Sequence, residues 1–208
     1  MKKTLAALLS ASLAASPCGF ALADSESYFE SFESAVIGQN PDNIECMPGA
    51  GRIYVADVGG EQGKALFIET ENDGTYVSVK KQVSPLFGTY PVRAALKFMQ
   101  PHRCADAVIM QIYSGDTLLV SVEARGGDIA YKTQSGYKTL ISGYGADIFY
   151  DISAILELSS GTAEITAGGM SAETELLGKS SSADALKSFT RLSPGFVIDD
   201  ISFGHVIG

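Results

Sequence analysis

Apolar and polar side chains alternate along most of this 208-residue chain, and this alternation constrains the fold more than any other feature. A period of two places successive side chains on opposite faces of an extended strand. Residues 92–98 put four apolar side chains on one face and the cations Arg93 and Lys97 on the other. The pattern predicts a half-buried β-strand.

Two further segments, 108–113 and 118–125, show the same alternation, with Val108 and Leu118 beginning the apolar series. Residues 114–116, Ser-Gly-Asp, have the composition of a hairpin turn. Turns of this kind recur about every 10 to 15 residues, and strands do not alternate with helices. The sequence therefore predicts an all-β chain folded as an antiparallel two-sheet sandwich.

Another hairpin is predicted near the C-terminal end. Residues 150–158 and 162–167 alternate in the same way and flank a Ser-Ser-Gly turn. Residues 178–188 are rich in Ser, Lys and Ala and lack this clear alternation. We expect them to form a loop, or a short helix, beside the sheets.

The first 23 residues have the features of a secretory signal peptide. Lys2 and Lys3 precede an apolar run over residues 5–15, and Ala21-Leu22-Ala23 gives a small-x-small ending. The run is too short to span a bilayer, and no later run reaches 18 apolar residues. We expect cleavage after Ala23, one domain over residues 24–208 that does not insert into a membrane, and export to the periplasm or the cell exterior.

Charge and cysteine content narrow the expected partners. The formal net charge is −9, which gives no electrostatic reason to bind nucleic acid or an anionic membrane surface. The predicted cleavage removes Cys18 and leaves Cys46 and Cys104. In an oxidising compartment such a pair predicts a structural disulfide. The spacing does not match the Cys-x-x-Cys motif of a reactive thiol pair.

Short motifs follow one another in order along the predicted mature chain. Residues 28–41 open it with Tyr-Phe-Glu-Ser-Phe-Glu-Ser and a following Gly and Pro, and residues 63–78 supply a pair of strands. A hairpin over 149–169 and an apolar-Asp-Asp-apolar strand over 196–203 complete the series. Together these segments resemble concanavalin A-like (laminin G-like) jelly-roll domains of secreted bacterial proteins. The resemblance implies a jelly-roll sandwich, a fold on which domains bind sugars, cleave polysaccharides or act as spacers.

Polar side chains on the predicted strands are candidates for binding a carbohydrate or a cell-surface partner. Guanidinium, amide and phenol groups hydrogen-bond sugar hydroxyls, and Tyr rings stack on sugar faces. The absence of Trp from the chain counts against this hypothesis, and an ordinary solvated sheet face is the alternative. The candidate residues are Arg93, Lys97, Gln111, Tyr113, Glu123, Arg125 and Tyr131.

A second hypothesis is a polysaccharide lyase on the same fold. Arg93, Gln111-Ile112-Tyr113, Tyr131-Lys132 and Tyr137 resemble in order the signatures of alginate-lyase jelly rolls. Tyr113 replaces the expected His, however, and Ala-Ala follows Arg93. No glycosidase-type carboxylate string is present; residues 69–73 come nearest and run into a Gly turn. A non-catalytic binding domain is therefore the first hypothesis, with a lyase-like enzyme or a structural envelope domain as alternatives.

Three carboxylates are candidates for a structural calcium site. In a sandwich whose first and last strands pair, Glu33 comes close to Asp199 and Asp200, and hard oxygen ligands suit Ca²⁺. The alternative is that one Asp points outward and the other caps a turn. The two histidines, His102 and His205, lie far apart in sequence, and neither belongs to a catalytic motif.

Overall fold

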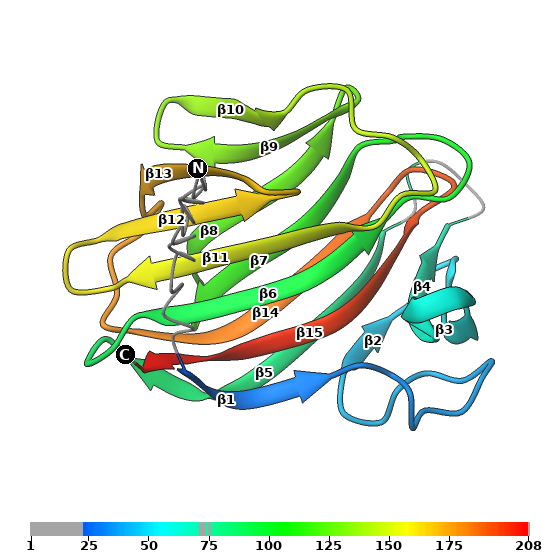
Figure 1. Ribbon diagram of the computed structural model, residues 1–208, viewed down its shortest axis with the longest axis horizontal. Coiled ribbons are helices and arrows are strands. Elements are labelled where there is room, and N and C mark those ends of the chain that lie inside the picture. The colour runs from blue at the N-terminus through cyan, green and yellow to red at the C-terminus, as the bar shows by residue number, and fades with distance from the viewer. Residues whose placement is uncertain (1–22, 71–73, 75, 208) are drawn as a thin grey trace, which may run out of the picture.

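The computed structural model describes residues 23–70, 74 and 76–207, so residues 1–22 of the predicted signal peptide lie outside the described part of the chain. Two antiparallel β-sheets face each other, one of eight strands and one of seven (Figure 1). A single 3-10 turn, η1 (Gly60–Gln62), is the helical element among the described residues, where no helix is long and apolar enough to cross a membrane. The prediction of an all-β, antiparallel two-sheet jelly-roll sandwich is confirmed.

The eight-stranded sheet is organised around its longest strand, β15. This strand pairs with β4 near its start and with β1 farther along. It has the order β13-β12-β11-β6-β15-β4-β3, with β1 also paired to β15. These strands are β13 (Met170–Glu175), β12 (Thr162–Ala167), β11 (Tyr150–Glu157), β6 (Val92–Met99), β15 (Phe196–Ile207), β4 (Lys64–Glu69), β3 (Arg52–Asp57) and β1 (Ala23–Glu30).

The seven-stranded sheet covers the other side of the core. Its order is β10-β9-β8-β7-β14-β5-β2, so β14 lies between two strands that are distant from it in sequence. These strands are β10 (Gly136–Ile141), β9 (Asp128–Thr133), β8 (Thr117–Arg125), β7 (Ala107–Ser114), β14 (Ser182–Thr190), β5 (Val77–Phe87) and β2 (Glu45–Met47).

Apolar side chains from both sheets meet in one core. Along β6 every second residue from Val92 to Phe98 is buried, as the alternation predicts. Phe98 packs against Phe196 and Tyr144, with ring centroids 5.8 and 6.1 Å apart. Burial of each large apolar side chain contributes about 1.5–3 kcal/mol, so this continuous core holds the two sheets together. The predicted hairpin of 150–158 and 162–167 is confirmed as β11 and β12.

The predicted inward faces of β7 and β8 are partly wrong, because each strand contains a register irregularity. Pairing shifts between Val108 and Met110 in β7, and Leu119 lies at the second shift, in β8. A bulge adds one residue and reverses which side chains face inward beyond it. Ile109 and Leu119 are therefore fully buried in the core, whereas Val108 and Leu118 lie outside the core cluster.

The expected loop or helix at 178–188 is wrong for most of its length. Residues from Ser182 onward form β14, which pairs with β7 on one side and β5 on the other. Ala183, Leu186 and Ser188 are buried, and the Ser188 hydroxyl donates a 2.6 Å hydrogen bond to the Ile109 carbonyl. Small and hydroxyl-bearing residues fill this tightly packed strand, so its inward positions do not form the apolar pattern of the other strands.

The predicted disulfide is also wrong, because both cysteines are free thiols. Cys46 lies on β2, three strand spacings or about 14 Å from β7. Cys104 precedes β7, and its thiol contacts the Tyr144 carbonyl oxygen at 3.2 Å. Tyr144 in turn bonds to Gly127 at the β8–β9 turn, on the side of β7 away from β2. A disulfide requires Cα atoms within about 7 Å, so this topology keeps the two thiols apart.

Candidate functional site

The outer face of the seven-stranded sheet gathers polar and aromatic side chains from neighbouring strands. Gln111 on β7 lies opposite Ser121 on β8 and Lys187 on β14. Alternate residues of a strand share a face, so Glu123 lies on the same side as Ser121. We call this surface the polar face, and its residues are Gln111, Tyr113, Ser121, Glu123, Arg125, Tyr137 and Lys187.

A continuous chain of hydrogen bonds crosses the polar face. The Tyr113 hydroxyl donates to Gln111 Oε1 at 2.6 Å, and Gln111 Nε2 donates to Ser121 Oγ at 3.2 Å. Ser121 Oγ donates to Glu123 Oε1 at 2.9 Å, and the Tyr137 hydroxyl donates to the same oxygen at 3.0 Å. The three central side chains are buried, so the network holds both phenols in a defined position.

An ion pair lies beside a hollow of about 300 Å³ at one end of this network. Arg125 Nη1 lies 3.3 Å from Glu123 Oε2, and the guanidinium carbon lies 3.9 Å from the centroid of the Tyr137 ring. Val108 and Phe189 contribute apolar surface to the hollow. A cation, a carboxylate and apolar surface together provide both hydrogen-bonding and stacking contacts for a sugar ring.

A second aromatic group lies across β14 from this network. The rings of Tyr76 and Phe189 have centroids 5.1 Å apart. Lys187 Nζ lies 5.0 Å from the Tyr76 centroid and 5.4 Å from that of Phe189. These distances are typical of cation–π contacts. The part of the chain that the structure describes places no carboxylate within ion-pair distance of Lys187.

Both phenols of the hydrogen-bond network stay protonated near neutral pH. Burial raises the pKa of Tyr113, and the nearby Lys187 ammonium opposes this effect. Burial also raises the pKa of Tyr137, reinforced by the charge of Glu123 and the hydrogen bond to it. Each phenol therefore remains a hydrogen-bond donor, and neither serves as a ready proton acceptor at ordinary pH.

The structure brings together four of the predicted site residues and separates three from them. Gln111, Tyr113, Glu123 and Arg125 share the polar face. Arg93 and Lys97 lie on β6, in the other sheet of the sandwich. Tyr131 lies on β9 with its side chain in the core and only 4% exposed. The alternation identifies the outward side of each strand, but it does not show to which sheet that strand belongs.

Other residues of the polar face were missed by the sequence-based selection of binding residues. Lys187 lies in the segment for which the sequence predicts a loop, and Phe189 lies on the same strand, one residue before its end. The alternation places Ser121 on the outward side of its strand, but a single serine does not by itself indicate a binding site. The sequence Leu186-Lys187-Ser188-Phe189 could have indicated these residues. If it forms a strand, the side chains of Lys187 and Phe189 share one face.

The predicted calcium ligands lie near one another, but the site already contains a cation. The charge of Glu33 contributes to a raised pKa of Asp199, which places the two carboxylates in one region. Lys97 Nζ lies 2.7 Å from Asp200 Oδ2, and Glu33 Oε1 accepts the Lys64 backbone N–H at 2.8 Å. Over the described ranges, no three His, Cys, Asp or Glu side chains form a group that could hold a metal ion. These residues do not fit the six to eight oxygen ligands of calcium.

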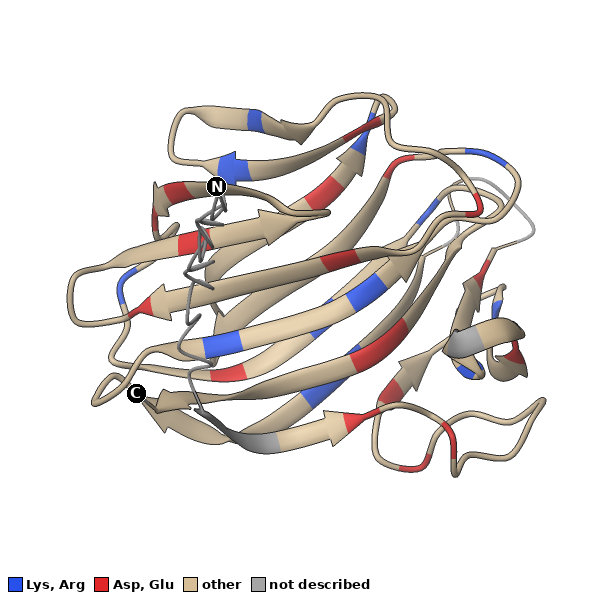
Figure 2. Cartoon of the chain, viewed as in Figure 1, with Lys and Arg blue, Asp and Glu red and all other residues tan. Residues whose placement is uncertain are grey.

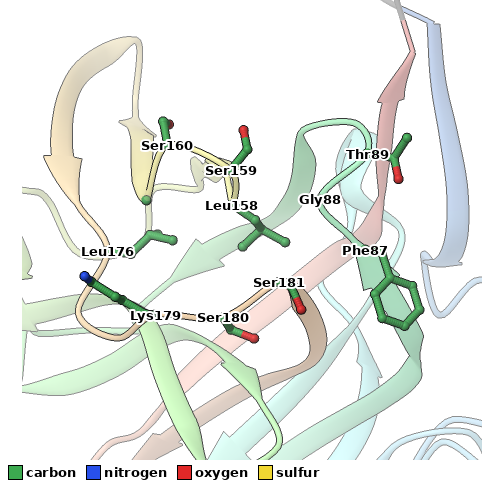
Figure 3. Close-up of a pocket in the computed structure, with 11 residues that line it drawn as sticks. Phe87, Gly88, Thr89, Leu158, Ser159, Ser160, Leu176, Lys179, Ser180 and Ser181 are labelled. Carbon is green, nitrogen blue, oxygen red and sulfur yellow. The ribbon is translucent and has the colours of Figure 1, made fainter.

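A larger hollow, of about 740 Å³, opens where turns meet at one end of the sandwich (Figure 3). Leu158 and Leu176 line it together with hydroxyl-bearing turn residues and Lys179. Two of its hydroxyls form local hydrogen bonds, since Ser160 Oγ donates to the Glu157 carbonyl and Ser180 Oγ to the Ser114 hydroxyl. The network that aligns buried polar groups toward one surface is on the polar face instead, so we place the candidate site there.

Comparisons with known proteins identify the fold. No protein-family profile and no curated protein matches the sequence. Solved structures align over most of the chain at low identity: a sialidase gives a TM-score of 0.68 at 10% identity over 88% of this chain. This chain has a concanavalin A-like jelly-roll fold.

Two of the other similar structures match this chain over nearly their whole length. The carbohydrate esterase vb_24B_21 from the Shiga toxin-encoding bacteriophage phi24B aligns at a TM-score of 0.65 and 15% identity, over 89% of this chain and all of the phage chain. Lectin II from Ulex europaeus aligns at a TM-score of 0.57 and 10% identity, over 86% of this chain and 99% of the lectin. The jelly roll spans only 19% of the sialidase chain. At these identities the similarity establishes the fold alone.

Proposed function

We propose that this jelly roll is an exported, non-catalytic domain that binds a carbohydrate on its polar face. The observation that carries the proposal is the buried chain from Tyr113 to Glu123, which presents donors, acceptors and phenol rings on one sheet surface. On an ordinary solvated sheet face, side chains such as Gln111 and Glu123 would be hydrated by water. Here they are buried in a connected network, and burial of such groups is costly unless every hydrogen-bond partner is in place.

The named activities of structural neighbours support the carbohydrate class. One neighbour is a lectin and another is a carbohydrate esterase. Proteins of one fold carry out different functions, so this support is for the class of ligand and not for a reaction. The residues of the polar face carry the rest of the argument.

The non-catalytic part of the proposal rests on the separation of the lyase-like residues. A lyase needs a cation at the sugar carboxylate and a proton acceptor and donor on the same side of the substrate. Arg93 lies in the opposite sheet from Gln111 and Tyr113, so these three side chains do not face one substrate. We expect no unsaturated sugar products when the domain is incubated with polyuronates, and such products would overturn this part of the proposal.

Glycan-array binding followed by titration calorimetry tests the binding proposal. Tyr137 is 40% exposed and contacts both Glu123 and Arg125, so Tyr137→Ala should weaken sugar binding about tenfold. The matched control is Tyr90→Ala, since Tyr90 is 51% exposed in the turn between β5 and β6, away from the polar face. Tyr90→Ala should leave the affinity unchanged. Absence of binding to every glycan on the array would contradict the proposal and favour a structural envelope domain.

Export is tested separately. The N-terminal sequence of the protein recovered from the periplasm or the medium should begin at Asp24, the residue directly after the predicted cleavage between Ala23 and Asp24. Recovery of the uncleaved chain from the cytoplasm alone would contradict the proposed export without affecting sugar binding.

A further inference from the structure

The outward charges are distributed unevenly over the two sheets: three strands of the eight-stranded sheet are acidic, β6 beside them carries Arg93 and Lys97, and the seven-stranded sheet is mainly basic. On β11, β12 and β13 the outward positions are strongly acidic (Figure 2). These positions hold Asp151, Glu157, Glu164, Glu173 and Glu175. The outward positions of the seven-stranded sheet, with the residue after β14, have more cations than carboxylates. The cations are Lys80, Arg125, Lys132, Lys187 and Arg191, and the carboxylates are Glu45, Glu123 and Asp128. An acidic chain therefore presents a basic surface at its candidate site.

The carboxylates near this basic surface are mostly engaged by protein groups. Glu123 accepts hydrogen bonds from Ser121, Tyr137 and Arg125. Asp128, opposite Arg125, accepts the Gly143 backbone N–H and the Thr139 and Ser142 hydroxyls. At the strand ends, Asp106 accepts the Gly126 backbone N–H, and Asp184 accepts that of Gly115. Glu45 on the edge strand β2 lies opposite Lys80.

Two lysines lie directly opposite each other on this surface. Lys187 on β14 pairs in register with Lys80 on β5, and on its other side it lies opposite Gln111. Like charges directly opposite across strands are destabilising. An anion bound between them relieves this repulsion, and the same Lys187 ammonium lies over the rings of Tyr76 and Phe189.

We propose that the ligand of the polar face is a polyanionic polysaccharide, with carboxylate or sulfate groups held by Lys80, Lys187 and Arg125 while its sugar rings contact Tyr113 and Tyr137. This inference rests on the proposed carbohydrate-binding function and specifies its ligand class. Lysine ammonium groups provide point charges for single anionic groups, and the planar Arg125 guanidinium matches a carboxylate or sulfate edge.

Three polymers with one backbone test the ligand class: dextran, carboxymethyl dextran and dextran sulfate. We expect the two anionic polymers to bind at least about tenfold more tightly than neutral dextran, with affinity falling as salt rises. The carboxymethyl and sulfate arms distinguish the two kinds of anion. If neither anionic polymer binds more tightly than dextran, the inference is overturned, whereas neutral glycans that bind on the array would leave the proposed function intact.

A charge-matched pair of variants separates a specific site from general electrostatic attraction. The double variant K80Q/K187Q removes two positive charges from the basic surface of the seven-stranded sheet. K138Q/K179Q removes two from elsewhere: Lys138 pairs in register with the inward Tyr131, and Lys179 lines the end hollow. K80Q/K187Q should weaken binding of the better anionic polymer by about tenfold or more, and K138Q/K179Q by less than about twofold. Equal losses in both variants would overturn the inference.

Discussion

Replacing Asp199 with Asn should stabilise the domain at alkaline pH and have little effect in acid. Asp199 lies on β15 and is only 2% exposed, and its Oδ1 atom has no hydrogen-bond partner. Burial, together with the charges of Asp200 and Glu33, raises its pKa from 3.8 to about 7, although the Asp200 backbone N–H and Lys97 oppose the shift. The structure therefore holds an ionised carboxylate at a cost.

The size and sign of this cost follow from linkage. A pKa of about 7 against an ordinary value of 3.8 corresponds to about 4 kcal/mol, because one pH unit is worth about 1.4 kcal/mol. Between these values the native state binds more protons than the unfolded state, so stability falls as pH rises from about 4 to about 7. Asp199→Asn removes this loss, and we expect a gain of roughly 1–4 kcal/mol at about pH 8 and almost none at about pH 4.

Urea unfolding followed by circular dichroism at several pH values measures the effect. The matched control is Asp200→Asn, whose side chain is 34% exposed and paired with Lys97, and which should lose no more than about 1 kcal/mol at about pH 8. A loss of stability in Asp199→Asn at about pH 8 would refute the reasoning, because it would mean that the ionised carboxylate of Asp199 is stabilised by a bound group.

Three further predictions concern stability. Lys187→Gln should raise the free energy of unfolding by a few tenths of a kcal/mol at low salt in the absence of ligand, since it removes repulsion from Lys80, and urea unfolding at low and high salt checks this. Cys46→Ser should unfold at the same urea concentration with and without a reducing agent, as should the natural chain, because Cys46 and Cys104 are free thiols; a midpoint that falls on reduction would reveal a disulfide. Chelation with EDTA should leave the melting temperature unchanged, because the Lys97 ammonium neutralises Asp200; a lower melting temperature would restore the calcium hypothesis.

The strands could be predicted from the sequence because their pattern is local. Burial in β6 follows its alternation residue by residue, and the Ser-Ser-Gly turn correctly separates β11 from β12. The bulges of β7 and β8 could not be predicted, because an inserted residue such as Ile109 or Leu119 is as apolar as its neighbours. A segment of consecutive apolar residues is compatible with more than one register until the partner strand fixes it.

The candidate site depends on long-range pairing, and this limits what the sequence reveals about it. Arg93 and Gln111 both point outward from alternating strands that are close in sequence, yet β6 and β7 belong to opposite sheets. The chain passes from one sheet to the other between them, so the two outward side chains lie on opposite surfaces of the sandwich. Lys187 reaches Gln111 from a strand 76 positions later only because β14 inserts between β5 and β7. A second change of sheet, between β10 and β11, separates the acidic strands β11–β13 from the basic outward positions of the seven-stranded sheet, so the net charge of −9 does not show where the cations gather. The proposed binding of an anionic ligand therefore depends on the sheet to which each strand belongs, and the overall composition does not contain this information.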